Sequence, residues 1–405
     1  MRRNDTKHRR AFMSSLIVGV LSIGMVVSTA GVASAASSGG SSSNPIVLGG
    51  IYTNTPIPFG ADALAMSKAV FADVNAHGGI RGQQIRYMFG DDGGSNATAA
   101  ADARQFVGAG AVAMVGDASF STCGQNSGYY LQQNIVDIVA VGVDPLCYAS
   151  PNIASVEPSP YLQLTASLYF AAKYLHVKRQ CLFQPLTPGA GTAISNAIKA
   201  YEKAAHQTLT IKDTSLSTSG TVDFTPLLLR AKLAGCQSFF YGGATDTIAH
   251  TLLQTAKTQG LSKLNMLLIS ISYTKQLAQT SESLGVPAYV TASLYPFTQV
   301  GKQNAGFRAL AQKYHVNQTE FSLDAYVAAN WVVSVLKSIK GPITRAKVTA
   351  AFKKGAAYKT PLSTAPLVFG PAKTHNALVR PTIVQLTKNG WKLRLLGMKV
   401  PGVTS

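Results

Sequence analysis

A strand–helix–strand unit within residues 45–92 places the strongest constraint on how this chain folds. The apolar run Ile46–Ile51 is too short for two helical turns and therefore predicts a buried strand. Apolar residues then recur at helical spacing over 63–74, and Gly78-Gly79 marks the helix end because glycine readily adopts the left-handed cap conformation. A second short strand is predicted over 84–89. Such units build parallel sheets, whose ligands bind beyond the carboxyl ends of the strands.

The alternation of strands and helices continues beyond this unit. Residues 111–115 and 135–141 are nearly continuous apolar runs, which is typical of strands in a sheet that helices cover on both faces. Residues 153–160 break the rhythm with two prolines in a polar segment, and we interpret them as a crossing between two lobes. A new cycle of helices and strands over 161–294 predicts a second lobe with its own core. The predicted fold class is therefore α/β.

The N-terminus predicts an export signal rather than part of the fold. Basic residues occupy five of the first ten positions, an apolar run covers 16–27, and Ala33-Ser34-Ala35 matches an A-x-A cleavage site. The apolar run is shorter than the roughly 20 residues that a membrane-spanning helix needs. We therefore expect residues 1–35 to be a signal peptide. The pair Arg9-Arg10 leaves twin-arginine and Sec export both open.

A Gly/Ser-rich segment, 36–44, follows the predicted cleavage site and is typical of a flexible tether. No cysteine lies near that site, so a lipid anchor on a lipobox cysteine is not expected. We expect the exported chain to be periplasmic or extracellular and associated with the cell envelope. Signal removal leaves 370 of the 405 residues, which fit two domains better than one.

The chain is strongly basic, with a formal net charge of +19. The predicted signal carries five basic residues and one acid, so its removal leaves a net charge of +15. Nucleic-acid binding would need basic residues clustered with aromatic ones, whereas Lys and Arg are scattered singly here. We therefore expect a solvated basic surface and no nucleic-acid partner. Attraction to an anionic envelope or to an acidic ligand is the alternative.

Four cysteines in an exported chain predict disulfides. Cys123 and Cys147 each follow a predicted strand in the first half, and Cys181 and Cys236 each begin a strand in the second half. We therefore expect pairing within each half, as Cys123–Cys147 and Cys181–Cys236. No C-x-x-C or H-x-x-x-H spacing accompanies the cysteines, so neither a metal site nor a cofactor is predicted.

Sequence motifs of common enzyme classes are missing. The chain has no G-x-S-x-G, no G-x-x-x-x-G-K-[ST] and no H-E-x-x-H, and no Rossmann glycine triplet follows its first strand. Gly189-Ala190-Gly191 follows a predicted strand, but Ile194 occupies the position of the third glycine, so we interpret this segment as a plain helix start. We therefore expect a binding protein and not an enzyme.

The sequence of the first unit resembles a known family. An aromatic residue and a glycine precede the helix, an Asn-Ala-x-Gly-Gly-Ile-x-Gly motif ends it, and two acids close the next strand. The residues concerned are Phe59, Gly60, Asn75, Ala76, Gly78, Gly79, Ile80, Gly82, Asp91 and Asp92. This pattern resembles extracytoplasmic solute-binding proteins of the branched-chain amino acid (leucine-binding) type, which serve ABC importers. Weaker resemblance continues to about Phe369.

The resemblance implies a type I periplasmic binding protein fold. This fold has two Rossmann-like lobes, each a parallel sheet with helices on both faces, joined by a three-segment hinge. The expected lobes are 45–157 with 295–375, and 158–294 with 376–398. Two short apolar runs on either side of Asn389-Gly390, 383–386 and 391–396, predict a hairpin in or near the second lobe. A hinged cleft of this kind can enclose a small solute.

The resemblance also implies ligand contacts in loops that follow strands. In the family, the loop after the third strand supplies a hydroxyl and backbone N–H groups to the ligand carboxylate, and Ser119 and Ser121 match it here, with Phe120 between them. Phe59 matches the family's aromatic residue in the first loop. The alternatives are helix capping by the serines and core packing of Phe59. Further candidates near Phe59 are Tyr52 and Asn54.

Other positions depart from the family pattern. The family's threonine, two ligand-covering tyrosines and acid fall here on or near Asp144, Pro188, Ala244 and Ile271. Asp246 or Asp144 is a candidate for the missing acid. Tyr273, with its neighbour Ser272, and Tyr295 are candidates for the missing aromatic residue. Without such replacements the ligand need not be an α-amino acid, because an unpaired buried ammonium is costly.

One function is expected, and two alternatives stay open. We expect a monomeric extracytoplasmic solute-binding protein that captures a small polar solute in the cleft between its lobes and delivers it to an ABC permease. The solute would be an amino acid, an amide or a related organic compound. One alternative is a ligand-sensing subunit of a membrane receptor. The other, an exported α/β enzyme, is disfavoured by the missing motifs.

Overall fold

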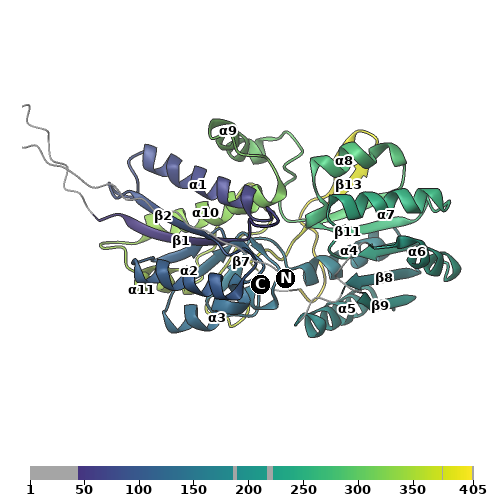
Figure 1. Cartoon of the computed structure of the whole chain (residues 1–405), viewed down its shortest axis with the longest axis horizontal. Helices are drawn as coiled ribbons and strands as arrows, with labels where there is room; N and C mark the ends of the chain where they lie inside the picture. The colour runs from purple at the N-terminus through teal and green to yellow at the C-terminus, as the bar shows by residue number, and fades with distance from the viewer. Residues whose placement is uncertain (1–43, 186–188, 217–221, 376, 404–405) are drawn as a thin grey trace, which may run out of the picture. The chain divides into compact units, whose positions relative to one another are not determined.

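The chain forms two α/β lobes in the computed structural model, which describes residues 44–185, 189–216, 222–375 and 377–403. Each lobe contains one β-sheet with helices packed on it (Figure 1). This architecture confirms the predicted α/β fold class. Across the described ranges, the structure contains no helix that is both long and apolar enough to span a bilayer.

The sheet of the first lobe is parallel throughout. Its strands are β1 (Ile46–Tyr52), β2 (Ile85–Asp91), β3 (Ala113–Val115), β4 (Ala118–Ser119), β5 (Asp137–Val139), β6 (Val141–Gly142) and β7 (Ile153–Ser155). β1 lies between β2 and β3, and β5 and β7 follow beyond β3. β4 follows β3 along the same side of β1, because both strands pair with β1. β6 follows β5 in the same way and pairs with β4. Two of the central strands are therefore interrupted near their carboxyl ends.

Helices cover both faces of the first sheet. They are α1 (Ala61–Ala76), α2 (Asn96–Gly108), α3 (Thr122–Gln132), α9 (Ala305–Lys313), α10 (Glu320–Ser338) and α11 (Arg345–Lys353), with short 3₁₀ turns η1 (Pro145–Cys147) and η4 (Lys302–Asn304). Ile46 and Leu48 of β1 belong to a core cluster with α1 and α10, whereas Val47 and Ile51 belong to a cluster with α2 and α3. Alternate side chains of a strand point to opposite faces, so β1 is buried on both (Figure 1).

The second sheet is parallel except at its C-terminal edge. Its strands, in spatial order, are β9 (Ile211–Leu216), β8 (Gln180–Pro185), β10 (Ser238–Tyr241), β11 (Asn265–Ile269), β12 (Ala288–Ala292), β13 (Thr382–Thr387) and β14 (Gly390–Leu395). β13 and β14 form the predicted hairpin at Asn389-Gly390, and β13 pairs antiparallel with β12. The predicted hairpin therefore adds an antiparallel edge to an otherwise parallel sheet, because a two-residue turn joins only antiparallel neighbours.

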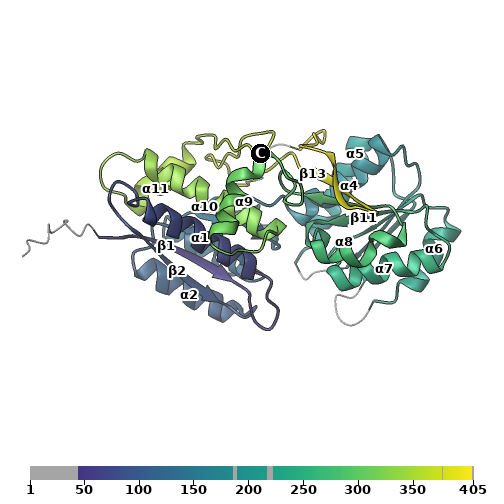
Figure 2. The same cartoon turned by 90° about the horizontal axis from the view of Figure 1, so that it is seen from above.

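Helices also cover both faces of the second sheet. They are α4 (Pro160–Tyr174), α5 (Gly191–Ala205), α6 (Phe224–Leu233), α7 (Asp246–Thr258) and α8 (Lys275–Ser281), with 3₁₀ turns η2 (Ser270–Ser272) and η3 (Glu282–Leu284). Figure 2 shows α4 and α5 on one face of this sheet and α6, α7 and α8 on the other. The core clusters agree, because Leu182 and Phe240 pack with α4 and α5, while Phe183 and Phe239 pack with α6 and α7.

The chain passes from one sheet to the other three times, after β7, after β12 and after α11. The return to the first lobe is held by Arg345 of α11, whose guanidinium donates to the carbonyl oxygens of Val107 and Ala111 at 2.7 and 3.0 Å.

Ile153–Ser155, which we had assigned to the first crossing, instead forms the edge strand β7, where a strand needs only one partner. The lobe boundaries expected from the sequence stay a prediction.

Both predicted disulfides are present. Cys123 pairs with Cys147 at a Cα–Cα distance of 5.1 Å, and Cys181 pairs with Cys236 at 5.9 Å. Each bond lies within one half of the chain, as its strand positions predict.

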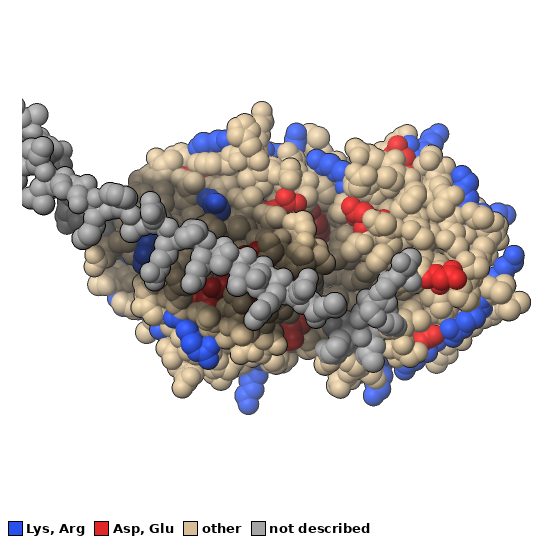
Figure 3. Space-filling view, viewed as in Figure 1, with Lys and Arg blue, Asp and Glu red and all other residues tan. Residues whose placement is uncertain are grey.

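The basic surface is mostly unpaired. Among the described residues, two Lys or Arg side chains form ion pairs, Arg230 with Asp213 and Lys313 with Asp73, each at 2.7 Å. Figure 3 shows Lys and Arg spread over the face in view, without one dense patch. This distribution fits the predicted solvated basic surface.

Candidate functional site

A cavity of about 500 Å³ lies where strands of both sheets end. The first lobe contributes residues that follow β1, β4 and β6, together with the first turn of α10. The second lobe contributes residues at the ends of β8, β10 and β11. Those that define the walls are Phe59, Phe120, Val141–Pro145 and Phe321 from the first lobe, and Gln184, Pro185, Tyr241–Gly243 and Ile269–Ile271 from the second. Such a position, beyond the carboxyl ends of parallel strands, is where α/β folds bind ligands.

Three aromatic rings form one wall of the cavity. Phe59 stacks on Phe120 with ring centroids 4.3 Å apart, and Phe321 meets Phe59 edge-on at 5.1 Å. We call these three residues the aromatic wall. Phe120 is 43% exposed although it is a large apolar residue, so its ring is open to a ligand. The sequence predicted Phe59 and Phe120 as ligand-binding residues, and the structure places both against the cavity.

Glu157 lines the cavity at the first crossing, just after β7. Its side chain is buried, and Oε1 accepts hydrogen bonds from the hydroxyl of Ser270 and from Nε2 of Gln163, the latter at 3.3 Å. Oε1 of Gln163 in turn accepts the backbone N–H of Ser270 at 2.7 Å. Burial, helped by the nearby charge of Glu320, raises the pKa of Glu157 to about 8. At neutral pH this carboxyl is therefore mainly protonated.

Two further buried acids lie near Glu157, both on α10. Glu320 Oε1 accepts the backbone N–H of Ser293 at 2.5 Å, and Asp324 Oδ2 accepts the Ser293 hydroxyl at 3.2 Å. Burial raises the pKa of Glu320 to about 7 and that of Asp324 well above its usual value, with Glu320 and Glu157 adding to the second shift. We call Glu157, Glu320 and Asp324 the buried acid cluster. The described ranges contain no group of three His, Cys, Asp or Glu side chains placed to hold a metal ion.

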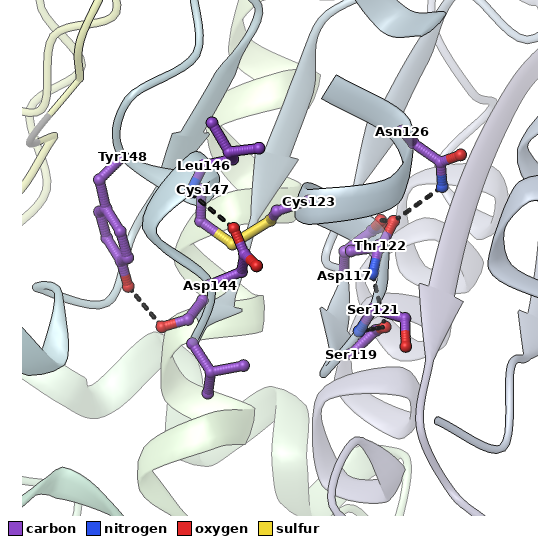
Figure 4. The surroundings of a disulfide bond; sticks show 12 residues. Asp117, Ser119, Ser121, Thr122, Cys123, Asn126, Asp144, Leu146, Cys147 and Tyr148 are labelled. Atoms are coloured by element: carbon purple, nitrogen blue, oxygen red, sulfur yellow. Dashed lines mark hydrogen bonds between the residues drawn. A yellow bond between two sulfur atoms is a disulfide. The ribbon is translucent and has the colours of Figure 1, made fainter. Parts of the chain in front are cut away.

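The loop before α3 satisfies its own polar groups. The hydroxyl of Ser119 donates to Asp92 and accepts the backbone N–H groups of Ser121 and Thr122 at 2.9 and 3.0 Å. Figure 4 shows Ser119, Ser121 and Thr122 at the start of α3. Ser119 is buried and does not line the cavity. The structure therefore gives this hydroxyl a capping role, which was one of the two roles that we considered, and its contact with a ligand stays a prediction.

Replacing Ser119 with alanine is expected to destabilise the protein by about 1 to 3 kcal/mol, because two backbone N–H groups and a carboxylate oxygen of Asp92 lose their partner. Urea unfolding measures the change. Ser121→Ala is the matched control, since it keeps the N–H group that bonds to Ser119, and we expect it to cost about 0.5 kcal/mol or less. Equal effects of the two substitutions would contradict the capping role.

Two other predicted residues of the first lobe lie behind the cavity and not in it. Tyr52 is fully buried, and its hydroxyl shares a hydrogen bond with that of Tyr87. The backbone N–H of Asn54 donates to Asp91 at 2.8 Å. Asp144, by contrast, lines the cavity and caps the η1 turn by accepting the N–H of Leu146 at 2.7 Å. Of the first-lobe candidates, the structure therefore brings Phe59, Phe120 and Asp144 together.

The remaining described candidates, Ala244, Asp246, Ser272, Tyr273 and Tyr295, lie outside the cavity lining. The hydroxyl of Ser272 donates to the carbonyl of Ala244 at 2.6 Å, and Asp246 accepts the Thr274 hydroxyl at 2.7 Å. Tyr273 is buried, and its ring lies 4.6 Å from that of Phe297. The ring of Tyr295 packs against the core. Pro188 lies outside the described residues, and for all of these a ligand contact stays a prediction.

Sequence reasoning missed several residues of the cavity. They are Glu157, Tyr161, Gln163, Gln184, Tyr241, Ser270 and Phe321. Glu157 carried a usable signal, because it is the one acid in the proline-containing stretch 153–160, which we interpreted only as a crossing. Ser270 carried none, because its contacts with Glu157 and Gln163 join segments more than a hundred residues apart.

Two α/β lobes, three crossings and a cavity at the strand ends of both sheets define a two-lobed solute-binding protein. The comparison with known families agrees. The family model for periplasmic binding proteins matches residues 45–390, and the chain belongs to this family.

Known proteins resemble this chain at low sequence identity. A Leu/Ile/Val-binding protein homologue of Brucella abortus is 24% identical over 218 residues, which cover 53% of this chain and 57% of that protein. A fatty acid ABC transporter substrate-binding protein of Thermomonospora curvata has a TM-score of 0.73 at 15% identity. The match covers 88% of this chain and 93% of that protein. A branched-chain amino acid transporter substrate-binding protein of Streptococcus pneumoniae, solved with isoleucine, has a TM-score of 0.69 at 16% identity. The match covers 87% of this chain and 99% of that protein. These likenesses show the type I periplasmic binding protein fold.

Proposed function

We propose that this protein is an extracytoplasmic solute-binding protein that captures a small organic solute in the cavity and delivers it to the permease of an ABC transporter. The observation that carries the proposal is the cavity itself. It is lined by residues at the strand ends of both sheets, and a ligand there contacts both lobes at once. A volume of about 500 Å³ suits a small molecule and is too small for a folded partner.

The lining favours a solute with an apolar body. The aromatic wall of Phe59, Phe120 and Phe321 offers flat apolar surface, and a set of branched apolar residues extends it: Val141, Val143, Ile194, Val222, Ile248, Ile269 and Ile271. Polar groups are fewer and sit at separate points, which is typical of sites that fix the orientation of a mostly apolar ligand. The relatives differ in the ligands their names give, so the fold supports capture of a solute without naming it.

Replacing Phe59 with alanine is expected to weaken binding of the captured solute by about tenfold or more, because stacking surface on the aromatic wall is lost. A thermal-shift screen of amino acids, amides, amines, organic acids and short peptides would first identify a solute, and calorimetry would then compare the variants. Phe89→Ala is the control, since this exposed ring on β2 does not line the cavity. Loss of affinity in Phe89→Ala alone would contradict the proposed site.

Capture also differs from catalysis in what happens to the solute. A binding protein returns its ligand unchanged, so chromatography after hours with the purified protein should recover all of the solute. Formation of a product would support the enzyme alternative instead.

A further inference from the structure

The charged groups of the cavity are all of one sign. Among its described lining residues there are two acids, Glu157 and Asp144, and no Lys, Arg or His. The whole chain has 36 Lys and Arg against 17 acids, so a cavity with this composition departs strongly from the average. A ligand carboxylate placed here would meet two like-charged or protonated acids and no basic side chain among the described residues.

The first-lobe loop offers a carboxylate little compensation. The backbone N–H of Phe120 donates to Thr53 Oγ1 at 3.2 Å. The next two N–H groups, of Ser121 and Thr122, donate to Ser119. These donors are therefore engaged within the protein, and a ligand anion would have to displace the hydroxyl oxygens of Thr53 and Ser119 that accept from them.

The helix starts around the cavity are partly capped as well. Ser159 caps α4 by accepting the N–H of Leu162 at 2.9 Å, and Thr319 caps α10 by accepting that of Ser322 at 3.2 Å. α5 and α7 begin without a side-chain cap, and Ala190 and Ile248 at their starts line the cavity. The N–H groups there can bind a hydroxyl or carbonyl oxygen at the far end of a ligand.

The buried acid cluster has no cationic partner among the described residues. The groups that donate hydrogen bonds to Glu157, Glu320 and Asp324 are the hydroxyl of Ser270, the amide of Gln163, and the backbone N–H and hydroxyl of Ser293. Tyr148 also lies within range of Glu157 and Asp324. Both residues are at most 2% exposed, and Oε2 of Glu320 and Oδ1 of Asp324 have no hydrogen-bond partner. Without a compensating charge these acids hold protons near neutral pH, and a cation beside them would favour their ionised forms.

We propose that the solute carries a positively charged nitrogen on an apolar or aromatic body, with the nitrogen against Glu157 and the body against Phe59, Phe120 and Phe321. The inference rests on the proposed function, because it specifies the solute of the same cavity. An ammonium group supplies the charge that the buried acid cluster lacks, and the faces of the aromatic wall attract the same cation. Glu157 is the new binding residue that this assigns.

Binding of a cation is coupled to the ionisation of Glu157. Because the pKa of this carboxyl is raised to about 8, a bound cation favours its charged form and releases a proton at neutral pH. Affinity for a cationic solute therefore rises with pH up to about 8, whereas a neutral solute shows no such dependence.

The test uses three probes that share one phenyl ring and differ in the charge of the head group: 2-phenylethylamine, 2-phenylethanol and 3-phenylpropionate. Calorimetry with the purified protein at pH 8 is expected to show the amine binding about tenfold or more tightly than the other two. Between pH 6 and pH 8 the amine affinity is expected to rise by about fivefold or more, while the affinity for the alcohol stays constant. Glu157→Gln is expected to bring the ratio of amine affinity to alcohol affinity close to one.

Several results would overturn the inference. They are tighter binding of 3-phenylpropionate than of the amine, no amine binding at millimolar concentration, or an amine affinity that depends neither on pH nor on Glu157→Gln. The pH profile of the wild type decides the question even if the variant fails to fold. The inference can fail while the proposed function stands. A solute of any charge that binds more weakly to Phe59→Ala than to the wild type would still identify the cavity as the capture site. Absence of binding by every solute class would reject both.

Discussion

Between pH 5 and pH 8 the Glu320→Gln variant is expected to gain about 2 to 3 kcal/mol in free energy of unfolding relative to the wild type. The wild type should lose stability over this range because its buried acids must ionise inside the fold. Burial raises the pKa of Glu320 to about 7, whereas the same carboxyl in the unfolded chain titrates near its model value of 4.5. Between these two values the unfolded state is ionised and the native state holds the proton.

The sign follows from that difference in bound protons. Stability changes by about 1.4 kcal/mol per pH unit for each proton, and it falls with rising pH when the native state binds more protons than the unfolded state. The contribution is therefore complete below about pH 4 and is lost as the pH rises through 7. Glutamine keeps an amide oxygen to accept the N–H of Ser293 but does not titrate. The free energy of unfolding of the Glu320→Gln variant therefore does not contain this decrease with rising pH.

Urea unfolding at pH 5, 6, 7 and 8 measures the effect. Glu202→Gln on α5 is the matched control, because this acid lies outside the buried acid cluster. His375, whose pKa is lowered by burial, adds a slope of the opposite sign below about pH 6.5, but it is common to all three proteins and cancels in their differences. Parallel pH profiles of Glu320→Gln and the wild type would contradict the raised pKa.

Replacing Cys123 and Cys147 together with serine is expected to lower the free energy of unfolding by about 3 kcal/mol, because the unfolded chain regains the freedom of a loop of 24 residues. The bond ties the first turn of α3 to η1, directly beside the cavity lining (Figure 4). Tyr148 supports the same wall by donating its hydroxyl to the carbonyl of Gly142 at 2.6 Å. We therefore expect a weaker solute affinity in addition to the lost stability.

The second disulfide provides the control for this experiment. Cys181 lies on β8 and Cys236 just before β10, at the strand starts and away from the cavity lining. Its serine double variant is expected to lose a similar amount of stability, about 4 kcal/mol for the longer loop, and to keep its solute affinity. Calorimetry of both double variants at a temperature where each is folded makes the comparison. Equal losses of affinity would show that the first disulfide has no particular role at the site.

Much of the fold could be predicted because its signals are local. The buried run of β1 and the glycine pair that ends α1 are readable without tertiary contacts, and Gly78 and Gly79 have φ values of 89° and 72° as that ending requires. Asn389-Gly390 predicted the hairpin for the same reason. β7 was missed because an edge strand of three residues makes too short a pattern, and its partner β5 lies more than ten residues away.

The site was predicted less well because it depends on contacts between distant segments. Phe59, Phe120 and Asp144 follow strands directly, so their approach to the cavity could be inferred from the βα connections. The use of Ser119 as a cap depends on Asp92, and Glu157 depends on Ser270, and neither pairing leaves a pattern in the sequence. A hydroxyl that can cap a helix or bind a ligand is assigned only once its partner is in place.

The breaks between β3 and β4 and between β5 and β6 separate residues that build the sheet from residues that line the cavity. The segments before each break keep the parallel register of the buried sheet, while the segments after it place Phe120 and Val141–Pro145 at the cavity. Substitutions after a break can therefore retune what is bound without disturbing the framework. Relatives with about one residue in six in common can thus keep one scaffold while their named cargo ranges from isoleucine to fatty acids.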